Sequence, residues 1–144
     1  MDSIRKIIEA GIPVMGHLGF TPQLVNQLGG YRVQGRSAND AKAMIEAAKK
    51  LEKAGVFCVV LEMVPAHLAK KISETLSIPV IGIGAGKNCD GQVLVTNDIL
   101  GLSVKGMPKF AKKYADLYGE TKKAVANYIS DVKGGRFPGS EHSF

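Results

Sequence analysis

The sequence predicts an α/β fold, and three observations indicate it. Apolar segments alternate with amphipathic helical patterns along most of the 144 residues, which is typical of βαβ units and a parallel sheet. The run VFCVVLEMV is apolar almost throughout, as in a strand that is covered on both faces. Glycine or a polar residue closes three apolar segments, in GHLG, VLEM and GIGAG. Two architectures fit: an open doubly wound sheet, or part of a (β/α)8 barrel with parallel strands and flanking helices.

The first elements carry clear local signals. Residues 3–10 predict a helix with Ser3 as its N-cap and Gly11 as its terminator, and IPVMGHLG predicts the strand that follows. Residues 39–54 predict the next helix, with Asn39 as its N-cap, because apolar residues recur there on one helical face. The chain therefore opens in the order helix, strand, helix.

The later segments repeat this alternation of strand and helix patterns, and the patterns become weaker toward the end of the sequence. VFCVVLEMV predicts a strand, Pro65 opens a helix over residues 66–76, and SIPVIGIGAG predicts the third strand. GQVLVTNDILGL fits either a last short strand or a helix. Residues 108–117 and 119–133 predict helices, and residues 134–144 predict a loop-like tail. We expect residues 1–144 to form a single partial-barrel domain.

Composition and charge exclude several classes of protein. No apolar run reaches the roughly 20 residues that cross a bilayer, and no signal-peptide pattern opens the chain, so we expect a soluble, cytoplasmic protein without a membrane partner. The net charge of +6 lies largely in late residues at helical spacing, and without a nucleic-acid motif we expect no nucleic-acid partner. These late basic residues are Lys105, Lys109, Lys112, Lys113, Lys122, Lys123, Lys133 and Arg136. Cys58 and Cys89 have neither metal-ligand nor disulfide spacing, which predicts reduced thiols.

Two ionisable residues occur at expected strand ends, where both architectures place their chemistry. Glu62 closes an apolar run, and because a carboxylate without partners is costly in low dielectric, it is either a rim residue in an ion pair or a working acid. His17 also follows an apolar segment, but such a histidine alone is more often structural than functional. GIGAG resembles a dinucleotide fingerprint, yet Lys87 occupies its third glycine position, so we expect a tight turn.

Longer motifs carry a resemblance to a known family. The segments GHLGFTPQ, GGYRVQGR, VLEMVP, IPVIGIGAG with CDGQVLV, PKFAKKY and FPGSEHSF occur in this order. Together they resemble the carboxyl-terminal part of ketopantoate hydroxymethyltransferase, from about Gly11 to Phe144. The resemblance implies about strands five to eight of a (β/α)8 barrel and an enzyme of pantothenate biosynthesis that forms large homo-oligomers. It also implies the reaction, in which methylenetetrahydrofolate gives a one-carbon unit to 3-methyl-2-oxobutanoate, yielding ketopantoate and tetrahydrofolate.

The resemblance also implies roles for two residues. Glu62 matches the family's strand-end glutamate, which is expected to remove the proton from the carbon beside the ketone. His17 matches the histidine of the GHLG motif, which is expected to contact the bound keto acid. An α-keto acid is a weak carbon acid, so a metal must polarise its carbonyl. In the family this is a Mg²⁺ ion chelated by the keto and carboxylate oxygens of the substrate.

The chain departs from the family in length. A complete barrel needs about 250 residues, and the family's metal-binding aspartates and substrate-binding lysine belong to early strands without a counterpart here. We therefore expect the Mg²⁺ ligands in a missing amino-terminal part, assign no metal ligand in this chain, and expect little or no catalysis from it alone. A truncated product, one piece of a split enzyme and a non-catalytic assembly module remain alternatives. Open sheet edges favour a homo-oligomer or pairing with a complementing amino-terminal half.

The loop GGYRVQGR, residues 29–36, has two interpretations. It either covers the mouth of the site or touches folate through Tyr31, Arg32, Gln34 and Arg36, or it is a surface loop that packs on a neighbour. The sequence assigns no folate-contacting residue. The tail around residues 141–144 either docks or frays.

Overall fold

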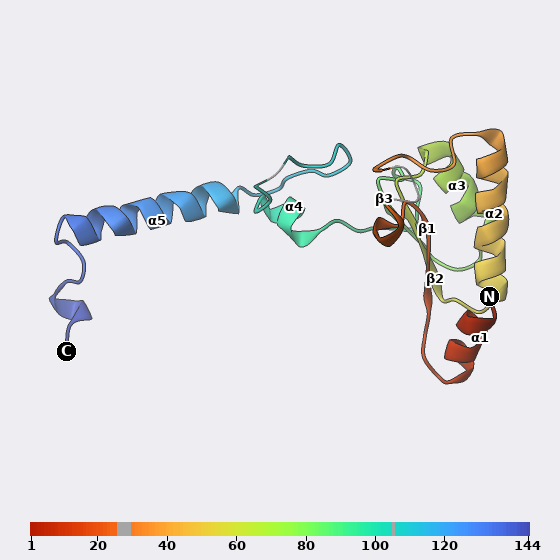
Figure 1. Ribbon diagram of the computed structural model, residues 1–144, viewed down its shortest axis with the longest axis horizontal. Helices are drawn as coiled ribbons and strands as arrows, with labels where there is room; N and C mark the ends of the chain where they lie inside the picture. Colours follow the sequence, from red (N-terminus) through yellow and green to blue (C-terminus); the bar gives the residue numbers. More distant parts are fainter. Residues whose placement is uncertain (26–29, 105) are drawn as a thin grey trace. The chain divides into compact units, whose positions relative to one another are not determined.

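A computed structural model (Figure 1) describes residues 1–25, 30–104 and 106–144. Gly29 of the predicted lid loop and Lys105 of the late basic residues lie outside the described residues. The chain divides into two compact units, Met1–Val93 and Leu94–Phe144. The single domain over residues 1–144, with its tail over 134–144, stays a prediction.

A four-stranded parallel sheet, in the order β1-β2-β3-β4, forms the centre of the first unit. Its strands are β1 (Met15–Gly19), β2 (Cys58–Glu62), β3 (Val80–Ile83) and β4 (Gly91–Gln92). Around them the chain forms α1 (Asp2–Glu9), the short 3-10 helix η1 (Pro22–Leu24), α2 (Ala38–Lys53) and α3 (Ala66–Thr75). Parallel strands joined by α2 and α3 confirm the predicted α/β fold and agree with part of a (β/α)8 barrel.

The core lies between one face of this sheet and the helices α2 and α3. Side chains alternate between the two faces of a strand, and Val59, Leu61 and Val80 on one face are fully buried. They form one cluster with buried residues of both helices, namely Ala48, Leu51, Leu68, Ala69 and Ile72. Both helices therefore cover the same face (Figure 1), as in a barrel, whereas a doubly wound sheet has helices on both faces.

The opposite face of the sheet is less covered. It carries Met15, which is 48% exposed, and the half-buried residues Val60, Ile81 and Ile83. In a closed barrel this face would line the interior. His17 and Glu62 also belong to this face, because they alternate in step with Met15 and Val60.

Two predicted helix caps are wrong. Ser3 lies inside α1, which begins at Asp2. Asn39 lies in the first turn of α2, and the N-cap is Ser37, whose hydroxyl accepts a hydrogen bond from the backbone N–H of Asp40 at 3.1 Å. Serine and asparagine cap helices about equally well, so residue type does not separate candidates two positions apart.

The second unit holds α4 (Thr96–Leu100), α5 (Leu117–Lys133) and the short 3-10 helix η2 (Ser140–His142). The segment GQVLVTNDILGL, predicted as strand or helix, forms both, as β4 and α4. The helix predicted over 119–133 is confirmed by α5, but residues 108–116 form turns and irregular backbone, so the helix predicted over 108–117 is wrong. The backbone N–H of Tyr114 instead donates to the carbonyl of Ile99 at 2.8 Å, a bond that a helix of its own would exclude.

No helix within the described ranges combines the length and the apolar character that crossing a membrane requires.

Candidate active site

The adjacent strands β1 and β2 bring the two predicted site residues together, although His17 lies in the middle of β1 and not after the strand as predicted. His17 lies in β1 opposite Val60, and Glu62, the last residue of β2, lies opposite Gly19. The two side chains therefore occupy the same face of adjacent strands and are offset by two residues in the strand register. His17 Nε2 lies 3.1 Å from Glu62 Oε2. This register explains how residues separated by a strand, a helix and two loops come into contact.

The Glu62 carboxylate is the more shielded member of this pair. Its side chain is 15% exposed, whereas that of His17 is 35% exposed. Half-buried Ile83 lies opposite Glu62 in the neighbouring strand. The contact with His17 gives one carboxylate oxygen a polar partner, which offsets part of the cost of placing an acid among apolar side chains. The contact fits both interpretations of Glu62, the ion pair and the working acid.

Three neighbouring segments hold the backbone at Glu62. The carbonyl of Glu62 accepts a hydrogen bond from Phe20 N at 2.8 Å. The N–H of Met63 donates to the Ile83 carbonyl at 2.9 Å, and the Met63 carbonyl accepts from Gln34 N at 2.9 Å. The two peptide groups after the Glu62 Cα are thus fixed by the end of β1, the end of β3 and the loop before α2. A base on so rigid a backbone keeps its Cα position during a reaction.

Two unusual backbone conformations occur at this strand end, at Met63 and Gly19. Met63 has φ 50°, in the left-handed region that non-glycine residues rarely adopt and that clusters at functional sites. Gly19 has φ 92°, and a Cβ atom there would collide with the backbone oxygen of Glu62. The second glycine of GHLG therefore permits the close approach of β1 to Glu62, and it was the available sequence signal.

The predicted lid residues lie in several environments. Gln34 reaches the strand end through its backbone, as described above, and its side-chain amide donates to the Arg32 carbonyl at 2.9 Å. Tyr31 stacks on Phe20 with ring centroids 5.0 Å apart, while Arg36 is exposed. The described part of the loop is therefore tied to the strand end by the Gln34 backbone and by the contact of Tyr31 with Phe20, and its role as a lid stays a prediction.

The turn after β3 has the conformation that a glycine-rich segment permits. Gly84 and Gly86 have φ values of 63° and 81°, and a Cβ atom at Gly86 would lie 2.5 Å from the Cβ of Ala66. These glycines therefore allow the chain to turn closely beside the start of α3.

The described residues hold no group of three or more histidine, cysteine, aspartate or glutamate side chains that could coordinate a metal ion. A Mg²⁺ site needs several oxygen ligands in octahedral geometry. His17 and Glu62 alone do not fit that requirement, so the described part of the chain does not form a Mg²⁺ site by itself.

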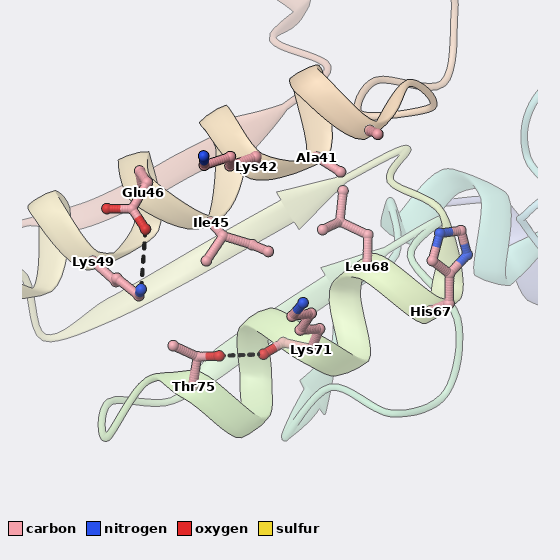
Figure 2. Close-up of a pocket in the computed structure, with 10 residues that line it drawn as sticks. Ala41, Lys42, Ile45, Glu46, Lys49, His67, Leu68, Lys71 and Thr75 are labelled. Carbon is pink, nitrogen blue, oxygen red and sulfur yellow. Dashed lines mark hydrogen bonds and ion pairs between the residues drawn. The ribbon is translucent and has the colours of Figure 1, made fainter.

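A groove of about 510 Å³ lies away from this pair, between α2 and α3 (Figure 2). Its walls are mainly lysine and aliphatic side chains, including Lys42, Ile45, Lys49, Leu68 and Lys71. The Lys49 ammonium pairs with Glu46 at 3.0 Å, and the exposed His67 lies at one end. Neither His17 nor Glu62 lines this groove, so it is separate from the candidate chemistry.

Both cysteines are free thiols. Burial raises the pKa of Cys58 and Cys89 above the ordinary value of 9.0, and the charge of Asp90 raises both further. A hydrogen bond with the Val59 backbone partly offsets this at Cys58. Thiols with a raised pKa are weak nucleophiles at neutral pH, so neither cysteine is a candidate nucleophile.

Comparisons with known proteins identify the family. Residues 1–140 match the family model described as ketopantoate hydroxymethyltransferase. The 3-methyl-2-oxobutanoate hydroxymethyltransferase of Pseudothermotoga lettingae is 56% identical over 142 residues, which are 99% of this chain and 54% of the relative. The enzymes of the same name from Enterococcus faecalis and Thermotoga maritima are 57% and 52% identical over 143 residues, which are 99% of this chain and 52% and 53% of the relatives.

The chain spans about half the length of the curated relatives it matches. The match covers nearly all of its own residues, including both strand ends at the candidate site, and confirms the resemblance seen in the sequence motifs. The chain belongs to the ketopantoate hydroxymethyltransferase family.

Proposed function

We propose that this chain is part of a hydroxymethyltransferase that converts 3-methyl-2-oxobutanoate to ketopantoate, with Glu62 as the base. The observation that carries the proposal is the shielded Glu62 carboxylate at the end of β2, 3.1 Å from His17. Membership of the family and the names of the relatives support it. The co-substrate in this proposal is methylenetetrahydrofolate.

Glu62 would remove the proton from the carbon beside the ketone. The C–H bond breaks, the proton goes to a carboxylate oxygen, and the electron pair remains on the keto acid as an enolate. The enolate carbon forms a bond to the one-carbon unit of methylenetetrahydrofolate as one of that unit's two C–N bonds breaks, and the freed nitrogen takes the proton held by Glu62. Water then replaces the second nitrogen: its oxygen becomes the new hydroxyl group, its other proton goes to that nitrogen, and tetrahydrofolate leaves. A carboxylate on a fixed backbone favours the first step, because proton transfer depends on hydrogen-bond distance and alignment. The resemblance implies that His17 contacts the bound keto acid, and in the structure its ring lies beside the Glu62 carboxylate.

Mg²⁺ belongs to the proposal as the cofactor of the complete enzyme. The described residues do not fit a site for it, so we assign its ligands to the part of the family that this chain does not span. The step assigned to this chain is proton removal by Glu62, with His17 beside the base.

The proposal includes a partner that supplies further strands, either a second copy of the chain or an amino-terminal half. The partly exposed sheet face with Met15 supports this, as do the two edge strands, β1 and β4, which each pair on one side within the described sheet. A closed barrel of parallel strands has no free edges and a filled interior. Relatives of about twice the length are consistent with such a closure.

The same exposed face favours a second candidate function, a catalytically incomplete assembly half. In that case the apolar side chains of the face bind the partner, and Glu62 has no role in the reaction. The two candidates differ in whether the assembled protein removes the substrate proton.

Deuterium exchange tests the two candidates. The chain alone, and the chain mixed with a polypeptide that supplies the part of a relative that it does not span, are incubated with 3-methyl-2-oxobutanoate and Mg²⁺ in D₂O. Proton NMR follows the signal of the hydrogen on the carbon beside the ketone, and no folate is needed. We expect exchange in the mixture and its loss in Glu62→Gln. Exchange that persists in Glu62→Gln rejects the base, and absence of exchange despite association favours the assembly half.

A further inference from the structure

The backbone contacts at Glu62 leave the position of its carboxylate open. They fix the peptide groups after its Cα, but three rotatable side-chain bonds separate Cα from the carboxylate oxygens. A mobile carboxylate would spend only part of its time aligned with a substrate C–H bond. Some further contact must therefore select one side-chain conformation if Glu62 is an efficient base.

His17 makes that contact. Among the residues that the structure describes, it is the side chain that pairs with the Glu62 carboxylate, through Nε2 and Oε2 at 3.1 Å. Its ring has two rotatable bonds and extends from a strand paired at Val60, so it is a stiffer element than the glutamate side chain. The contact engages Oε2 and leaves Oε1 available.

The same contact restricts what His17 can do toward a substrate. An ionised carboxylate offers only acceptor atoms, so a favourable contact at this distance requires a proton on Nε2. In the neutral ring Nδ1 is then an acceptor, and it cannot donate to the keto or carboxylate oxygens of a keto acid. Only a doubly protonated ring could contact Glu62 and donate to the substrate at once. The contact that the structure shows is with Glu62, and it favours action through that carboxylate.

We propose that His17 is a positioning residue for Glu62, holding Oε2 so that Oε1 receives the substrate proton. This inference rests on the proposed function, because it assumes that Glu62 is the base. It assigns His17 an effect on the rate of proton removal, whereas a substrate contact would affect the concentration of keto acid that the enzyme needs.

The test uses the chain with its complementing polypeptide and measures deuterium exchange over a range of keto-acid concentrations. We expect His17→Ala to lower the maximal exchange rate roughly 100-fold, the loss that about 1 Å of misplacement can cause, with little change in the half-saturating concentration. His17→Gln should recover much of the rate, because its amide nitrogen can donate from a position near Nε2. His67→Ala is the matched control, since His67 is exposed and lies outside the site, and it should leave both quantities and the melting temperature unchanged.

Two results would overturn this inference while the proposed function stands. If Glu62→Gln abolishes exchange but His17→Ala changes only the half-saturating concentration, His17 is a substrate contact. If His17→Ala and His17→Gln lose activity in parallel with a lower melting temperature, its role is structural. Exchange that survives in Glu62→Gln, or that is absent from the unsubstituted mixture, instead rejects the proposed function and this inference with it.

Discussion

The two units of the chain stabilise their helices in different ways. In the first unit, α2 and α3 bury apolar residues against the sheet. In the second, the 17-residue helix α5 has no buried residue, and Val125, Ile129 and Val132 on it are exposed. Its described side-chain contacts include exposed ion pairs such as Glu120 with Lys123 at 3.0 Å, which contribute little, and an edge-on contact of Tyr128 with Phe137 at 5.6 Å between ring centroids. The candidate site therefore lies in the unit whose strands and helices are held in place by a hydrophobic core.

The largest expected difference is in core packing. Leu61→Ala should lower the free energy of unfolding by about 3 kcal/mol, because Leu61 is fully buried between the sheet and the helices. Ile129→Ala on α5 should change it by less than about 0.5 kcal/mol, since Ile129 is exposed. Urea denaturation followed by circular dichroism measures both. Equal losses would mean that α5 is packed in solution as tightly as the core.

Replacing a glycine by alanine should give a smaller difference in lost stability between the two units. Gly19→Ala should cost about 2 kcal/mol, because it places a Cβ against the Glu62 carbonyl at a positive φ. Gly135→Ala in the second unit should cost about 1 kcal/mol, since its φ is also positive but nothing lies near its Cβ position. Thermal unfolding compares the two variants. Deuterium exchange by the assembled protein should fall only for Gly19→Ala, and a loss in Gly135→Ala would contradict the assignment of the site.

Two aspartates provide a third comparison. Asp90 Oδ2 accepts hydrogen bonds from Val80 N at 2.8 Å and Ser73 Oγ at 3.1 Å, so Asp90→Ala should cost about 1.5 kcal/mol by leaving the strand N–H without its partner. Asp131 pairs with Arg136 on the exposed surface, and Asp131→Ala should cost less than about 0.5 kcal/mol. Chemical denaturation of both variants checks this order, and the reverse order would be evidence against the packing of the first unit.

The smallest expected effect concerns pH. A hydrogen bond from Lys113 lowers the pKa of Asp116 below its ordinary value of 3.8, and the positive charge of Lys113 adds to this. A lowered folded-state pKa contributes stability that is present above pH 3.8 and is lost as pH falls through the folded pKa. Because Asp116 is exposed, the stability change should be difficult to resolve. Lys113→Gln should raise the Asp116 pKa toward 3.8 in an NMR titration, and an unchanged pKa would show that the pair does not persist in solution.

The main strands and helices of the first unit could be predicted because each is long or strongly patterned. VFCVVLEMV is apolar except for Glu62, and the helix after Ser37 has a complete apolar face, so competing interpretations were few. The two-residue β4 and the short η1 lack such a pattern. Residues 108–116 were mispredicted because their pattern is helical while their backbone bonds with α4. Such pairing depends on distant residues, which local pattern does not contain.

The candidate site was predictable in its parts but not in its connections. Glu62 was signalled by a lone carboxylate in an apolar strand, and His17 by its place after another apolar segment, although His17 itself lies within β1. Their contact depends on the register of β1 and β2, which the sequence does not specify for strands joined by a helix. Neither the positive φ of Met63 nor the hydrogen bond from Gln34 N to the Met63 carbonyl is associated with a particular residue type, so only the structure could reveal them.

The hydrogen bond from the backbone N–H of Gln34 to Met63 allows the exchange of this amide proton to report on the opening of the loop. Because this N–H donates to the residue next to Glu62, solvent can replace its proton only when that part of the loop leaves the strand end. The exchange rate at Gln34 therefore measures how often the loop opens. If the loop closes over bound keto acid, added substrate will slow exchange at this amide while leaving that of a residue such as Val125 unchanged.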